Sequence, residues 1–104
     1  MKYFLPLFIL TQLLIGCVGV KKTGSSTVSG DGSSYETAIY INETNEMSGV
    51  KAEYAWLNEH YPGYKRNMQS LANHNGKPYD IIKIKTAAGD DVTVYFDISN
   101  FFGK

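Results

Sequence analysis

The stretch Asp91-Val92-Thr93-Val94-Tyr95-Phe96-Asp97-Ile98 decides the fold of this chain. Apolar side chains occupy every second position in it, namely Val92, Val94, Phe96 and Ile98. Because successive side chains of a strand point to opposite faces of a sheet, one face of this segment is wholly apolar and has to be buried. We therefore expect residues 91–98 to form a strand whose inner face lies in the core of a small sheet.

The residues before this strand predict two further strands and the turns that join them. Residues 79–86 alternate isoleucine with lysine in their second half, and Ala88-Gly89-Asp90 provides a turn into the last strand. Asn75-Gly76 is the pair that a type I′ hairpin turn prefers. Residues 65–72 are a weaker candidate for the first strand of the resulting three-stranded meander.

A helix is predicted over residues 49–61, with Ser48 as its N-cap and Pro62-Gly63 at its end. Its apolar residues recur at intervals of three and four and form one buried stripe. This stripe consists of Val50, Tyr54, Leu57 and Tyr61. A second stripe, made of Glu53, Trp56 and His60, lies away from the first and places Trp56 at the edge of the core or outside it.

Residues 38–42 also alternate and predict a short strand before the helix. The order of elements is then strand, helix and three strands. One helix packed on one face of a mostly antiparallel sheet defines a small α+β domain. We assign this domain to residues 35–104, with Phe101 and Phe102 packed on the helix or on the sheet edge.

The N-terminal segment predicts export and a lipid anchor. The apolar run of residues 3–15 is shorter than the roughly 20 residues that span a bilayer as a helix. Leu14-Ile15-Gly16-Cys17 resembles the lipobox of bacterial lipoproteins. The resemblance implies a signal peptide at 1–16, cleavage between Gly16 and Cys17, and a membrane partner held through acyl chains on Cys17. An ordinary secretory signal and a membrane helix are the alternatives.

Residues 17–34 are rich in Gly, Ser and Thr, and we interpret them as the lipidated cysteine followed by a flexible tether. Cys17 is the only cysteine, so the exported domain has no disulfide and depends on its own core. The 104 residues include 10 basic and 10 acidic ones. This balance leaves no basic excess and argues against a nucleic-acid partner.

No set of residues in the sequence predicts catalysis or a cofactor. His60 and His74 are the only histidines, and they lie in different elements without a metal-ligand spacing to Asp or Glu. The sequence has neither a glycine-rich phosphate loop nor a nucleophile elbow. We therefore expect a protein that is not an enzyme and binds no cofactor or metal.

The second half of the domain resembles small exported domains of the PepSY-like group. The resemblance rests on Tyr61-Pro62-Gly63-Tyr64, Asp80, Gly89 and Val94-Tyr95-Phe96-Asp97 and covers about half of the chain. In that group a helix ending near a Tyr-Pro-Gly turn leads into a three-stranded meander, which implies an inhibitory or binding module. The whole chain also resembles the small lipoproteins of bacterial envelopes that carry no assigned activity.

The sheet face opposite the helix offers a candidate binding face. We expect it to carry Tyr40, Tyr79 and Tyr95, because tyrosine is enriched where proteins bind proteins. Trp56 is a fourth candidate, either as a binding anchor or as a cover for the sheet edge. A solvated sheet face without any partner has similar residue types, so both interpretations stay open.

The expected function is therefore a lipid-anchored, non-enzymatic module of the cell envelope that binds a protein or peptide. One alternative is an inhibitor or immunity protein that acts on an envelope hydrolase, and another is a structural envelope lipoprotein. Val18 follows the lipidated cysteine where lipoproteins of the inner membrane often have Asp. In a host with two membranes this favours the outer membrane.

Overall fold

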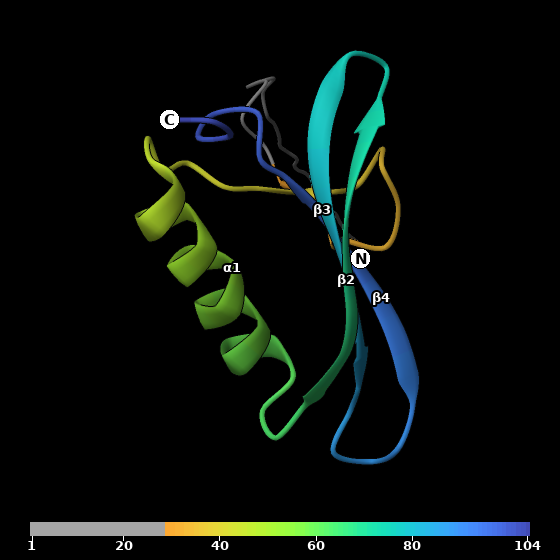
Figure 1. The fold of residues 1–104 in the computed structure, drawn as a ribbon. Helices are drawn as coiled ribbons and strands as arrows, with labels where there is room; N and C mark the ends of the chain where they lie inside the picture. The colour runs from red at the N-terminus through yellow and green to blue at the C-terminus, as the bar shows by residue number, and fades with distance from the viewer. Residues whose placement is uncertain (1–28) are drawn as a thin grey trace, which may run out of the picture.

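The computed structural model describes residues 29–104 of the chain. These residues form one helix and a four-stranded sheet, which lie in two layers (Figure 1). In chain order the elements are β1 (Ile39–Tyr40), α1 (Glu46–His60), β2 (Lys65–His74), β3 (Lys77–Lys85) and β4 (Asp91–Asp97). The signal segment 1–16, Cys17 and the first part of the expected tether lie outside the described residues.

The strand order across the sheet is β1-β4-β3-β2. β2, β3 and β4 form an antiparallel meander. β1 pairs in parallel with β4, so that Ile39 lies opposite Phe96 and Tyr40 lies opposite Asp97. The expected order of elements and the mostly antiparallel sheet of a small α+β domain are confirmed.

Two hairpin turns set the register of the meander. Asn75 and Gly76 have φ values of 52° and 79°. A type I′ turn needs positive φ at both central residues, so the predicted turn is confirmed. At the other hairpin the N–H of Thr86 donates to the carbonyl of Asp90 at 2.8 Å. The resulting register places Ile82 of β3 opposite Val94 of β4, so the apolar inner faces of these two strands lie side by side.

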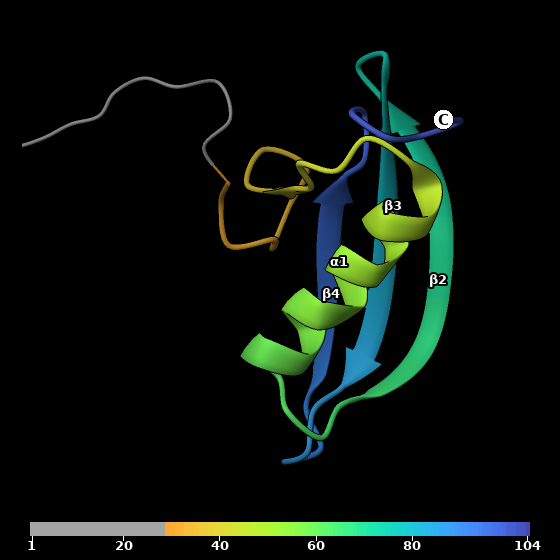
Figure 2. The same cartoon turned by 90° about the vertical axis from the view of Figure 1, so that its left-hand side faces the viewer.

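The core lies between α1 and the inner face of the sheet, which α1 crosses diagonally (Figure 2). Its buried residues are Ile39, Ile41, Leu57, Ile82, Ile84, Val94, Phe96, Ile98 and Phe101. Of the predicted helical stripe only Leu57 is fully buried, and its other members are half-buried. Glu53, which the sequence placed away from this stripe, is fully buried as well.

The helix begins at Glu46, earlier than the predicted start at Gly49. Asn45 rather than Ser48 is the N-cap, because the Asn45 side chain accepts a hydrogen bond from the N–H of Ser48 at 3.0 Å.

The earlier start places Gly49 inside the helix, where it is buried. The ring of Phe101 lies against Gly49 so closely that a Cβ atom there would overlap it. Phe101 is thereby held on the helix, as expected, while Phe102 remains 45 % exposed.

An arm formed by residues 29–38 packs against β4 on the side of the sheet away from α1 (Figures 1 and 2). The carbonyl of Gly32 accepts a hydrogen bond from the N–H of Tyr95 at 2.7 Å. The Ser29 hydroxyl accepts one from the N–H of Tyr40 at 2.9 Å. The folded part of the chain therefore includes residues before the expected boundary at Tyr35.

The contact between Gly49 and Phe101 gives a prediction about stability. Gly49→Ala should lower the free energy of unfolding, because overpacking costs about 1–3 kcal/mol and the gain in helix propensity is about 1 kcal/mol. Urea unfolding followed by circular dichroism measures the difference. Asn58→Ala, at an exposed position of the same helix, is the control and should be neutral or stabilising. An unfolding midpoint of Gly49→Ala above that of the wild type would contradict the packing described.

Candidate functional site

The structure brings together three of the four residues predicted to form a binding face. Tyr40 and Tyr79 both lie opposite Asp97 in the sheet, and Tyr95 precedes Asp97 by two residues. All three side chains therefore share the sheet face turned away from α1. Tyr79 is only 5 % exposed, whereas Tyr40 and Tyr95 are half-buried.

Tyr35 of the arm covers the centre of this face. Its ring stacks on His74 with centroids 3.9 Å apart. It also meets the rings of Tyr79 and Tyr95 edge-on, with both centroid distances at 4.9 Å. These four rings form an aromatic cluster that the chain itself closes, so that little of Tyr79 is left for a partner.

Trp56 lies in the other layer and is not brought near the three tyrosines. Its ring meets Phe96 of the core edge-on at 5.7 Å and stacks on His60 at 3.9 Å. The residue is half-buried, which agrees with its expected place at the edge of the core. His60 is held by this stacking and by a hydrogen bond between its Nδ1 atom and the Trp56 carbonyl at 2.9 Å.

Asp97 forms an ion pair on the outer face of the sheet. Its carboxylate lies 3.1 Å from Nζ of Lys77 and accepts hydrogen bonds from the hydroxyl and the N–H of Ser99. Burial acts to raise the pKa of Asp97, but the bonds from Ser99 and the Lys77 ammonium outweigh it and hold the pKa below its ordinary value. Asp97 is thus ionised and paired, which suits a structural role between β3 and β4.

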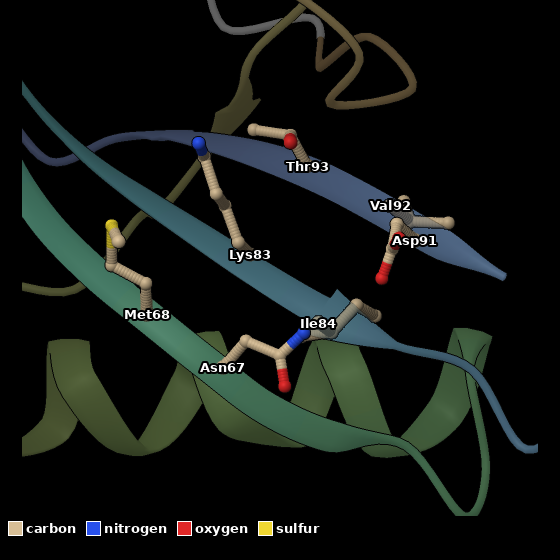
Figure 3. A pocket seen from close by; sticks show the side chains of 7 residues that line it. All are labelled: Asn67, Met68, Lys83, Ile84, Asp91, Val92 and Thr93. Carbon is tan, nitrogen blue, oxygen red and sulfur yellow. The ribbon is translucent and has the colours of Figure 1, made fainter. Parts of the chain in front are cut away.

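A shallow hollow of about 400 Å³ lies on the sheet face turned away from α1 (Figure 3). Met68, Lys83 and Thr93 come from three neighbouring strands and share the face away from α1. Asn67 lies at the irregularity of β2 between Arg66 and Met68. Lys83 and Asp91 are the charged residues that line the hollow.

A second concave feature, which we call the groove, lies between α1 and β2 and has a volume of about 200 Å³. Its lining residues are Glu46, Val50, Leu71, Asp80, Ile98, Phe101 and Phe102. The groove is therefore mostly apolar, and its two acidic lining residues are Glu46 and Asp80. Beyond it, the Tyr54 hydroxyl donates to Oε1 of Gln69 at 2.7 Å, and Arg66 donates to both groups, which ties α1 to β2.

Two carboxyl groups meet beside the groove. Glu53 is fully buried on α1, and Asp80 of β3 is 8 % exposed. Among residues 29–104 no donor reaches either oxygen of Glu53. Burial, together with a hydrogen bond that a protonated Glu53 can give to Asp80 and repulsion from that carboxylate, raises the pKa of Glu53 to about 9. Glu53 is therefore neutral at pH 7, and of the two residues only Asp80 lines the groove.

Sequence reasoning missed this pair because Glu53 lies off the apolar helical stripe. Asp80 offered a signal, since it interrupts the inner face of β3 on the same side as Ile82 and Ile84. A carboxyl group at a position that the alternation assigns to the core has to be buried or to line an opening. The groove explains why Asp80 is tolerated there.

Within residues 29–104 no group of three or more His, Cys, Asp or Glu side chains is arranged to hold a metal ion. The helix found in the same part of the chain is not long and apolar enough to cross a bilayer. Comparisons of the chain with protein-family models, with curated proteins and with solved structures give no match.

The buried Glu53 predicts a decrease in stability with rising pH. The unfolded chain releases this proton near pH 4.5, whereas the folded protein keeps it until about pH 9. Between these values the unfolded state binds fewer protons, so the free energy of unfolding should fall by about 1.4 kcal/mol per pH unit from this group. Asp97 has the opposite effect, because its lowered pKa makes the free energy of unfolding rise with pH. This effect is confined to acid, below the ordinary pKa of 3.8.

Urea unfolding at pH 5, 6, 7 and 8 tests this expectation. Glu53→Gln should flatten the dependence on pH, because the amide does not titrate. Glu59→Gln changes an exposed glutamate of the same helix and should retain the slope of the wild type. Equal slopes for the wild type and Glu53→Gln would contradict a neutral Glu53.

Proposed function

We propose that this protein is a lipid-anchored, non-enzymatic module of the cell envelope that binds an extended segment of a partner protein. The proposal combines the lipobox at Cys17 with the form of the folded domain. The observation that carries the binding function is the exposed edge strand β2. The resemblance of residues 61–97 to binding modules of the PepSY-like group points in the same direction.

β2 has the properties of a strand that accepts another strand. It is ten residues long, and seven consecutive residues from Lys65 to Leu71 are exposed. It lies at the end of the sheet, and no other element among residues 29–104 pairs with its outer edge. Such an edge offers a row of free N–H and C=O groups, which extended peptides use to add a strand to a sheet.

The two edges of the sheet differ in a way that favours β2. β1 at the opposite edge has only two residues, and the arm continues along β4 beyond it through the hydrogen bond from Tyr95 to Gly32. On β2 the only charged side chains are Lys65 and Arg66 at its start. The stretch from Met68 to Asn73 therefore lacks the charges that usually protect an edge against pairing.

A photocrosslinking experiment on the full chain in its membrane tests the binding function. With p-benzoylphenylalanine at Ser70 of β2, we expect a cross-link to one protein, and mass spectrometry should map it to one short segment of that partner. The same group at Asn58, exposed on α1, is the control and should give no such product. Identical products at both positions, or no product at Ser70, would contradict binding at the β2 edge.

The lipid anchor gives a separate prediction. Cys17→Ala removes the thiol that would carry the diacylglyceryl group, and with it the acyl chains that hold the protein on the membrane at roughly 0.8 kcal/mol per buried methylene. Fractionation of cells should find the wild type, processed and acylated, in the membrane fraction. Cys17→Ala should lack the acyl groups and remain uncleaved at Gly16. Val18→Ala, which keeps the lipobox, should behave as the wild type, and acylation of Cys17→Ala would contradict the assignment.

A further inference from the structure

The groove runs beside the exposed edge of β2, so a strand added at that edge would pass along it. Leu71 of β2 lines the groove from the inner side of the sheet and is 58 % exposed. Because directly opposite residues of paired strands share a face, a residue of the added strand opposite Leu71 would also lie on the α1 side. Its side chain would then enter the groove.

The size and walls of the groove suit one long side chain. A volume of about 200 Å³ is below the range of roughly 300–1,000 Å³ found for pockets that hold drug-sized ligands. The walls are formed by the side chains of Val50, Leu71, Ile98, Phe101 and Phe102. Apolar walls of this kind can pack against the methylene groups of a long aliphatic side chain.

The acidic lining residues of the groove favour a basic group at the end of that side chain. Its titratable lining residues, Glu46 and Asp80, are both acidic. Glu46 is partly engaged, because one of its oxygens accepts a hydrogen bond from the N–H of Gly103 at 2.8 Å. Asp80 is more than nine-tenths buried, and apart from the proton of Glu53 no donor in residues 29–104 is bonded to it. An ammonium group would supply the missing donor and the opposite charge.

We propose that the groove binds a lysine side chain of the partner, carried by an extended segment that pairs with the edge of β2. The methylene groups of the lysine lie between Val50, Leu71 and Phe102, and its ammonium group bonds to Asp80. This inference rests on the proposed function and adds to it the chemical class of the recognised segment. A second copy of the chain is a poorer occupant, because its Arg66 is already bonded to Tyr54 and Gln69. Its Lys65 lies opposite Lys85, on the sheet face turned away from α1 and from the groove.

Three labelled peptides of the form acetyl-Thr-Val-Xaa-Val-Thr-amide test the proposal, with Lys, norleucine or Glu at Xaa. Binding to the full chain in detergent is measured by fluorescence anisotropy. The lysine peptide should bind about tenfold more tightly than the norleucine peptide, because only lysine gives Asp80 a charge-assisted hydrogen bond. The glutamate peptide should bind most weakly. Equal affinities of the lysine and norleucine peptides, or no binding of either, would overturn the inference.

Variants of the groove make the test specific. Asp80→Asn should abolish the preference for the lysine peptide over the norleucine peptide. Asp90→Asn, in the exposed turn between β3 and β4, is the matched control and should keep the preference. If Asp80→Asn fails to fold, Leu71→Lys places a cation at the exposed mouth of the groove and should weaken the lysine peptide selectively. A preference for lysine that survives Leu71→Lys would overturn the inference.

The outcomes separate this inference from the function on which it rests. If the cross-link at Ser70 persists but the peptides show no preference for lysine, the groove does not select lysine and the binding function stands. If the cross-link at Ser70 is also absent, the binding function itself is contradicted. Self-association of the wild type through β2, measured by analytical ultracentrifugation, would overturn the inference in favour of a second copy of the chain.

Discussion

The structure depends on the packing of a single helix against a sheet that is wider than the helix. A helix with its side chains is about 10 Å across, and neighbouring strands are about 4.8 Å apart, so α1 covers only about two strands at any level. On the β1 side, Ile39 and Ile41 complete the core. On the β2 side, the bonds among Tyr54, Arg66 and Gln69 close the space only in part. The groove and the open edge are therefore consequences of the same limited coverage.

The limited coverage of the sheet by α1 also leaves room for two carboxyl groups, Glu53 and Asp80, beside the core. A fully buried ionised carboxylate is strongly destabilising, and the domain avoids this by keeping Glu53 protonated. Replacement of Glu53 and Asp80 by apolar residues would remove the desolvation cost of burying two polar groups. A small domain without a disulfide is only marginally stable, so this cost matters. Asp80 lines the opening beside the core, which is the position that the proposed lysine site requires.

Much of the fold could be predicted from the sequence, because it depends on local patterns. The alternation of residues 91–98 and the pair Asn75-Gly76 identified β4 and a hairpin without reference to any distant residue. The parts that could not be predicted depend on contacts between distant residues. Gly49 lies inside α1 with the ring of Phe101 packed directly against it, and Glu53 of α1 is buried within hydrogen-bonding reach of Asp80. Tyr35, the first residue of the expected domain, covers the rings of Tyr79 and Tyr95, which no local pattern indicated.

The position of the arm also decides how a membrane-attached domain would meet a partner. The described chain begins at Ser29, which is bonded to Tyr40 of β1, and the arm lies on the β4 side while β2 lies at the opposite edge (Figure 2). The proposed anchor at Cys17 would therefore join the domain at the edge that the chain itself protects. The unprotected edge, with the groove beside it, points away from that attachment. In the proposed function, attachment and binding would use opposite edges of one sheet, so a partner strand could add to β2 without displacing the bond between the arm and β4.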